Sequence, residues 1–320
     1  MVISMLLAVA LSARSTDRAD QQPLVIGVVL HTGIWKTDFG LPGATGETYE
    51  DFVLFPLAVS EKKTLKPFFP SGEWDQNLSK MADVEAFLSD RTTSIVNRML
   101  YGVGDKGRVF CPQNLVRCCG SLGTSVYGYR GRWNDGATPN RPTIVSTRPI
   151  RSLVTTGKTD TGGVLALSAE AIRKMEPGYK DTYLAKDYGF DPTLEGAPTQ
   201  TLSQNLRAIR GKRARWIEIT KPYKRKPDAE CTFSALYQGL FCRNRAGWSP
   251  YWEQAILLQN DGPLYEERYT LLGACDANND NTPEFVFQTN TCESSSLVIK
   301  ELRDGKLVEL ASLYGPFWWD

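Results

Sequence analysis

The chain has very little histidine, with one residue, His31, in 320. A hydrolase of the Ser-His-Asp type needs an imidazole base, and no G-x-S-x-G turn accompanies His31, so the sequence disfavours that class of enzyme. Seven cysteines occur without a C-x-x-C pair, which disfavours a zinc site. A phosphate-binding loop ending at Gly157-Lys158-Thr159 is also excluded, because Ser152 stands where its first glycine is required.

Net charge is nearly absent, since 37 basic residues face 36 acidic ones. No field of one sign extends over the whole chain, so nucleic acid is not an expected partner. Beyond the N-terminus no segment approaches the ~20 consecutive apolar residues of a membrane span, and no transmembrane segment is predicted.

The charge is uneven in one segment. Between Arg207 and Lys226 there are nine basic residues and one acid, Glu218. Such a run is typical of a polyanion site, and equally of a solvated linker or a strand edge at which charge discourages unwanted pairing. Both interpretations are kept, with a strand predicted at Arg215–Thr220 from its alternating pattern.

Residues 2–11 form an apolar run that is too short to span a membrane, and either Ala8-Val9-Ala10 or Leu11-Ser12-Ala13 offers small residues at a cleavage site. This is typical of a secretory signal and predicts a signal peptide at 1–13, a linker at 14–22 and a secreted or periplasmic protein. Seven cysteines agree with an oxidising destination. The candidate disulfides are Cys231 with Cys242, Cys275 with Cys292, and Cys111 with Cys118 or Cys119, which leaves one thiol unpaired.

The remaining chain is predicted to be mainly β with a few helices, α+β overall. Residues 23–150 form the expected N-terminal mixed α/β region, with strands at 23–30 and 51–58 and a helix within 78–101. Residues 151–230 are expected to be a helical and basic connecting region, with helices at 168–175 and 202–209.

Residues 231–320 are predicted to form an antiparallel β-meander. Its clearest element is a hairpin, because Asp304-Gly305 separates two alternating segments at 296–302 and 306–314. The aromatic residues Phe317, Trp318 and Trp319 that follow are expected to pack under the sheet.

The strongest chemical pattern is the segment from Asp276 to Glu284, between two strand-like stretches. Asp276, Asn278 and Asp280 stand at loop positions 1, 3 and 5, and Glu284 closes the segment with a carboxylate. Hard cations such as Ca²⁺ prefer oxygen ligands that a tight turn brings together. Position 6 holds Asn281, which tolerates the left-handed backbone that this turn needs.

The same segment has two other interpretations, an EF-hand and a turn without metal. An EF-hand is excluded because its twelfth position is Phe287 and the flanking segments are not helical. An Asp- and Asn-rich turn without metal has the same composition, since these residues favour turns by themselves.

From about residue 265 to 315 the strand, loop and strand resemble one repeat of the FG-GAP or VCBS type, the calcium-loop unit of integrin-like β-propellers. The resemblance implies that Ca²⁺ is bound by the side chains of Asp276, Asn278, Asp280 and Glu284 and by the carbonyl of Thr282. In that family glycine occupies the position of Asn281. No second copy is found in the chain, so a propeller made of repeats is not predicted.

Together these features favour a binding or structural protein outside the cytoplasm, with a calcium-stabilised β-domain and a ligand that the sequence does not name. The alternative is an extracytoplasmic hydrolase of the glycosidase kind, because two facing carboxylates suffice for that chemistry and need not be close in sequence. The eight tryptophans suit a sugar cleft or a protein core.

Overall fold

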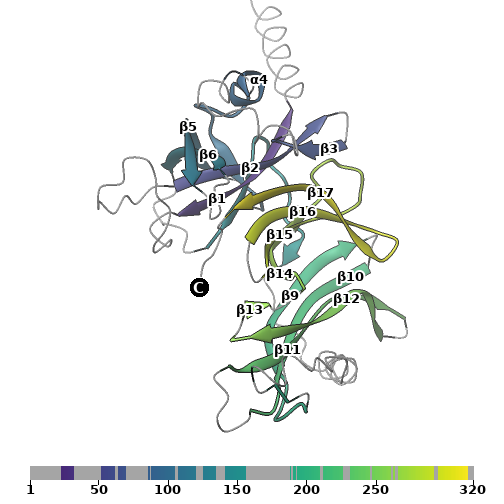
Figure 1. Cartoon of the computed structure of the whole chain (residues 1–320). Coiled ribbons are helices and arrows are strands. Elements are labelled where there is room, and N and C mark those ends of the chain that lie inside the picture. The colour runs from purple at the N-terminus through teal and green to yellow at the C-terminus, as the bar shows by residue number, and fades with distance from the viewer. Residues whose placement is uncertain are drawn as a thin grey trace, which may run out of the picture.

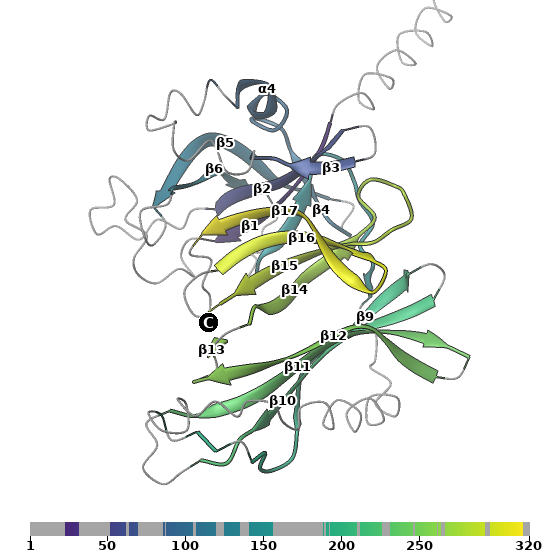
Figure 2. The same cartoon turned by 45° about the vertical axis from the view of Figure 1, so that its right-hand side comes forward.

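A computed structural model describes residues 23–31, 52–61, 64–69, 86, 88–104, 107–119, 125–134, 141–155, 188, 190–191, 193–209, 212–225, 231–245, 247–260, 262–263, 266–291 and 295–315. These residues form three antiparallel sheets (Figures 1 and 2). The predicted signal peptide at 1–13, the linker at 14–22, the helix at 168–175 and the aromatic residues 317–319 lie outside the described residues.

The first sheet closes into a barrel. Its strands are β1 (Leu24–His31), β2 (Phe52–Glu61), β3 (Thr64–Pro67), β4 (Leu100–Gly102), β5 (Arg108–Cys119), β6 (Ser125–Trp133) and β7 (Thr143–Ser146). Because β1 pairs with both β7 and β2, six strands form a ring in the order β1-β7-β4-β5-β6-β2, and β3 extends β2. Closure removes the open edges that would otherwise invite pairing with other chains.

The predicted strands at 23–30 and 51–58 are confirmed as β1 and β2, whereas the helix predicted within 78–101 is wrong over most of its described part. That part contains α4 (Ser89–Thr92) and then a series of turns before β4 begins. Asn97 has a φ of 58°, which a right-handed helix cannot contain.

The second sheet has six strands in the order β13-β12-β11-β10-β9-β8. They are β8 (Val154–Thr155), β9 (Thr199–Ile209), β10 (Lys212–Pro222), β11 (Phe233–Asn244), β12 (Gly247–Gln259) and β13 (Gly262–Pro263). The predicted helix at 202–209 is therefore wrong, because this segment is β9. Leu202 and Leu206 are four residues apart, a spacing that places two side chains on one face of a strand as well as of a helix.

The third sheet is a four-stranded meander of β14 (Arg268–Cys275), β15 (Glu284–Asn290), β16 (Ser295–Arg303) and β17 (Lys306–Gly315). It confirms the C-terminal meander, and the turn of its last hairpin has the positive φ values of 48° at Asp304 and 77° at Gly305 that a two-residue hairpin turn favours. The meander starts later than predicted, however, because β11 and β12 belong to the six-stranded sheet.

The meander lies between the other two sheets, and its two central strands, β15 and β16, are buried on both faces (Figure 1). Val286, Leu297 and Ile299 pack into the core shared with the barrel. Phe287 and Val298, which alternate with them, pack into the core shared with the six-stranded sheet. A strand with two buried faces needs consecutive apolar side chains, and the middle of each strand has three: Phe285, Val286 and Phe287 in β15, and Leu297, Val298 and Ile299 in β16.

The outer edge of β14 is one of the two edges of this sheet, the other being that of β17, and groups outside the sheet satisfy part of its backbone. The side-chain amide of Gln238 on β11 accepts a hydrogen bond from the Tyr269 backbone N–H at 3.0 Å and donates one to the Tyr269 carbonyl. Further along, the backbone N–H of Leu153 donates to the carbonyl of Ala274 at 2.7 Å. A buried edge left without such partners would carry unsatisfied polar groups.

The cysteine pairs predicted from local spacing do not form. Cys231 precedes β11 and Cys242 lies near its far end, so an extended strand separates them by far more than the ~6 Å between the Cα atoms of a disulfide. Cys275 and Cys111 are free thiols. Cys118 is in the same strand, β5, as Cys111, and Cys292 lies outside the described residues.

Replacing Gln238 by Met keeps the length of the side chain but removes the amide that satisfies Tyr269. Two backbone groups then lose their partners in a site where Gln238 is fully buried, and the free energy of unfolding should fall by roughly 2–5 kcal/mol. Chemical denaturation measures the change, and Gln113→Met, at a half-exposed position of β5, is the matched control with an expected change below about 0.5 kcal/mol. Equal stability of the two variants would contradict the role given to this amide.

Candidate metal centre

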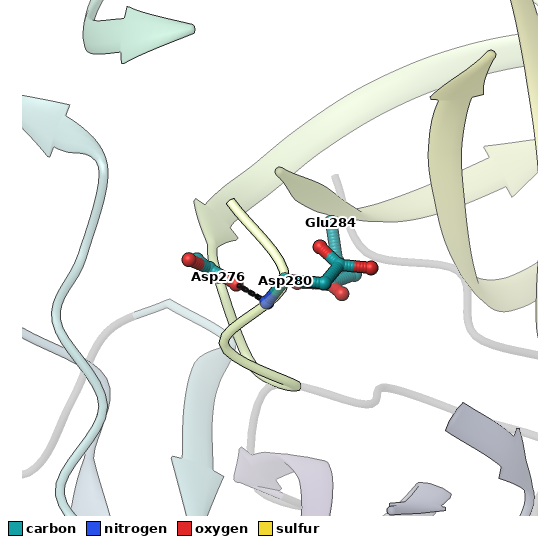
Figure 3. Close-up of side chains that lie close together, drawn as sticks. All are labelled: Asp276, Asp280 and Glu284. Atoms are coloured by element: carbon teal, nitrogen blue, oxygen red, sulfur yellow. Dashed lines mark hydrogen bonds between the residues drawn. The ribbon is translucent and has the colours of Figure 1, made fainter. Parts of the chain in front are cut away.

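The segment from Asp276 to Pro283 connects β14 to β15 at one end of the buried meander (Figure 3). Cys275 and Glu284 are directly opposite each other in the ladder, so the first acid of the loop and the acid that follows it start from neighbouring backbone positions. Strand pairing thus brings together the two ends of the predicted cation loop.

Side-chain oxygens hold the loop in a tight turn. The Asp276 carboxylate accepts hydrogen bonds from the backbone N–H groups of Asp280 and Asn281, at 3.1 and 3.2 Å. The Asp280 carboxylate accepts one from the backbone N–H of Thr282 at 2.7 Å. These bonds turn the chain back on itself, as Asp and Asn side chains commonly do.

Two residues of the loop have a left-handed backbone. The φ of Asn281 is 66°, which confirms the conformation expected at this position, and the φ of Asn279 is 57°. The sequence analysis did not identify Asn279, although asparagine tolerates this region better than other residues except glycine.

Three of the predicted ligands come together. Carboxylate oxygens of Asp276, Asp280 and Glu284 lie within 4.8 Å of one another, with Asp280 exposed, Asp276 half-buried and Glu284 buried (Figure 3). Three carboxylates at such distances repel each other unless a cation or a proton intervenes. An all-oxygen set of this kind fits a hard cation such as Ca²⁺ rather than a soft metal.

Glu284 differs from the other acids because it has no contact with solvent. One carboxylate oxygen accepts a hydrogen bond from the Ala277 backbone N–H at 2.7 Å. The other, Oε1, is buried and has no hydrogen-bond partner among the described residues. Burial, and then the charges of Asp280 and Asp276, raise the pKa of Glu284 to about 8, against the opposing effect of the Ala277 hydrogen bond.

The other two predicted ligands have different surroundings. Asn278 donates from its amide to Asp280 at 3.0 Å and accepts from the Asp280 backbone N–H at 3.0 Å, so both ends of its side chain stay within the loop. Thr282 contributes its backbone N–H to the turn. Coordination by Asn278 and by the Thr282 carbonyl stays a prediction.

A fourth acid lies beside this cluster and is already neutralised. Glu301 on β16 is opposite Glu284, and the Arg303 guanidinium donates to its two carboxylate oxygens at 2.8 and 2.7 Å. Arg303 therefore compensates Glu301 and also interacts with the charge of Asp280, whereas Asp276 and Glu284 form no ion pair within the described part of the chain. Cross-strand register creates this arrangement, and the sequence analysis missed it.

Cys275 is no nucleophile in this setting. Its thiol is fully buried, and burial, together with the charges of Glu284 and Asp276, raises its pKa far above the usual range. A thiol that stays protonated is unreactive.

The two remaining candidate sites are His31 and the basic run from Arg207 to Lys226, and the structure gives less support to a functional role for either. His31 ends β1, and its side chain is not among the described ones. In the run from Arg207 to Lys226, Arg215 points away from solvent: it is buried, lies 4.7 Å from the centre of the Trp248 ring and donates to Asn205 at 3.1 Å. Arg215 thus supports the sheet and offers nothing to a polyanion.

A scan against protein-family models and searches of curated proteins and of solved structures find nothing that matches the chain. No helix in the described part of the chain is long and apolar enough to cross a membrane.

Replacing Asn281 by Val tests the left-handed turn. A β-branched residue at a φ of 66° should cost about 1–2 kcal/mol in the free energy of unfolding, whereas Asn281→Gly should be tolerated, because glycine adopts this backbone without a steric penalty. Denaturation of both variants in EGTA measures the difference without any contribution from metal. A valine variant as stable as the glycine variant would contradict the turn.

The raised pKa of Glu284 predicts how the metal-free protein responds to pH. The unfolded chain releases this proton near the ordinary value of 4.5, but the folded chain keeps it until about 8. Between these values the folded state binds more protons, so stability in EGTA should fall as pH rises, by up to about 1.4 kcal/mol per pH unit. Chemical denaturation from pH 5 to 8.5 measures this slope, and Glu284→Gln should lack it. An identical slope in that variant would contradict the assignment.

Proposed function

We propose that this protein is an extracytoplasmic binding or structural protein whose buried meander is held in place by Ca²⁺ bound between Asp276, Asp280 and Glu284. One observation carries the calcium site: Glu284 is fully buried in an acidic cluster, and one of its oxygens has no protein partner among the described residues. A buried carboxylate in this condition needs a cation or a proton.

Ca²⁺ would neutralise the three carboxylates more completely than a single proton. A proton would neutralise Glu284 and leave Asp276 and Asp280 repelling each other, whereas a divalent ion attracts all three carboxylates at once. The ion would rigidify the turn between β14 and β15, the two strands that begin the meander. The role of the ion would be structural, because it would hold the turn and would not act on a ligand or substrate.

The proposed location outside the cytoplasm rests on the apolar N-terminal run and on the kind of loop, and not on disulfides. Calcium modules of extracellular proteins bind with dissociation constants of about 10⁻⁴–10⁻³ M, which suits a short loop with one exposed ligand, Asp280. Millimolar Ca²⁺ would then keep the site filled.

Calcium should raise the thermal unfolding midpoint of the wild-type protein at pH 8, because a ligand bound only by the folded state stabilises it by mass action. A tenfold excess over the dissociation constant corresponds to about 1.4 kcal/mol, or a few degrees. Asp280→Ala should lose this shift. Glu309→Gln removes one charge from an exposed position of β17, and this matched control should keep the shift.

Glu284→Gln gives the sharpest form of the same test, because two effects with opposite signs are expected. The variant should no longer respond to calcium, yet at pH 8 in EGTA it should melt above the wild type. Its amide oxygen retains the bond from Ala277, and its amide nitrogen donates to the neighbouring carboxylates without a buried charge. No calcium shift in the wild-type protein, or an unchanged shift in Glu284→Gln, would reject the proposed site.

A further inference from the structure

The segment that forms β4 to β7 is strongly basic although the whole chain is almost neutral. Between residues 91 and 155 the only acids are Asp105 and Asp135. The basic residues of the same segment are Arg91, Arg98, Lys106, Arg108, Arg117, Arg130, Arg132, Arg141, Arg148 and Arg151. Positive charge is therefore concentrated in this segment, as it is in the run from Arg207 to Lys226, and here arginine supplies nearly all of it.

Among the arginines of this segment whose side chains the structure describes, four are exposed: Arg108, Arg132, Arg141 and Arg151. They have no carboxylate partner within the described part of the chain, in contrast to Arg303, which is paired with Glu301. Arg108 rests on the Tyr101 ring, 5.5 Å from its centre, and donates from Nε to the Tyr101 hydroxyl at 3.0 Å. This contact holds one guanidinium at the surface without neutralising it.

The strands that carry these four arginines are hydrogen-bonded so that all four residues lie at one end of the barrel. β5 begins there with Arg108, and β6 ends there, since the backbone N–H of Asn134 donates to the Val109 carbonyl at 2.8 Å. Arg141 precedes β7, whose residue Ile144 accepts from Val103 at 2.9 Å.

Arg151 reaches the same end because the backbone N–H of Gly104 donates to the carbonyl of its neighbour Ile150 at 3.0 Å. We name this group of four, Arg108, Arg132, Arg141 and Arg151, the arginine rim. Exposed like charges at one end of a barrel repel each other, and an anionic polymer would relieve that repulsion.

We propose that the arginine rim binds an acidic polysaccharide. Guanidinium groups make paired hydrogen bonds to sulfate and carboxylate groups, and a linear polymer supplies such groups at repeated spacing. This inference names a ligand class for the binding role proposed above, and it does not involve the calcium loop.

Two other anionic partners fit the barrel less well. Single-stranded nucleic acid is bound largely by stacking of its bases on exposed aromatic rings. In the barrel, however, Tyr127, Tyr129 and Phe110 are buried, and Arg108 covers Tyr101. The half-buried rings of Phe52 and Trp133 stack on each other, 5.6 Å between centres. An anionic membrane favours exposed apolar anchors, and the exposed large apolar side chains in the described residues, Tyr188 and Tyr314, are outside the barrel.

The test compares binding of heparin, the probe polysaccharide, by the full chain and by two double variants, all in EGTA so that the result does not depend on calcium. Arg108→Gln/Arg132→Gln removes two charges from the rim. Arg213→Gln/Lys224→Gln is the matched control, because it removes two exposed charges from the run between Arg207 and Lys226. Thermal unfolding of each variant verifies that it folds.

The wild-type protein should bind heparin with an affinity that falls as salt is raised, and neutral dextran should not bind. The rim variant should bind roughly tenfold or more weakly, and the control variant should match the wild type. Absence of heparin binding, or equal weakening of both variants, would overturn the proposal. Loss in the control variant alone would place polyanion binding on the run from Arg207 to Lys226 instead.

Two further probes separate the polysaccharide from the other partners. A single-stranded oligonucleotide and phosphatidylglycerol vesicles are measured at the same salt concentration. Weaker binding of both than of heparin is expected. Tighter binding of either one would overturn the choice of polysaccharide. The calcium-dependent shift of the Asp280 and Glu284 variants is a separate measurement, and this outcome does not affect it.

Discussion

Burial of the two central strands of the meander, β15 and β16, on both faces is the constraint on which the rest of the structure depends. Val286 and Ile299 face the barrel, and Phe287 and Val298 face the six-stranded sheet, so neither outer layer is complete without the middle one. At the β14 edge of the sheet the backbone N–H and carbonyl of Tyr269 are buried, so they need partners from the protein. The Gln238 amide and the Leu153 backbone supply the hydrogen bonds that water gives elsewhere.

The same constraint explains the chemistry at the end of the sheet. Glu284 opens β15 on the face where Val286 also lies, so a carboxylate enters a region otherwise made of apolar side chains. Its fellow acid Glu301 is compensated by Arg303, but the loop provides Glu284 only with the Ala277 N–H and two more acids. The need for a cation thus follows from where strand pairing puts this residue.

Local patterns in the sequence were sufficient for some elements of the fold. The hairpin of β16 and β17 follows from alternation around Asp304-Gly305, because a two-residue turn determines its own register. The spacing of Asp276, Asp280 and Glu284 likewise predicted three groups that the structure brings within 4.8 Å. In both cases the interacting residues lie within about 20 positions of each other.

Other features depend on long-range pairing that no local pattern carries. Closure of the barrel requires β1 to pair with β7, more than 100 positions away, and the partition of β12 and β14 into different sheets depends on which faces meet. Leu202 and Leu206 suited a helix and a strand equally, and pairing with β10 decided between them. The burial of Glu284 could not be inferred either, since it depends on two sheets that cover its strand.

The crossing from the barrel to the six-stranded sheet has a mechanical consequence. Ser152 bridges to Cys275 and Leu153 bonds to Ala274, while Val154 and Thr155 pair with β9, so four consecutive residues are fastened to two different sheets. A force that pulls the barrel away from the six-stranded sheet would act along this short segment and reach Cys275 directly, one residue before the cation loop. The loop therefore lies where tension between the layers would first be felt.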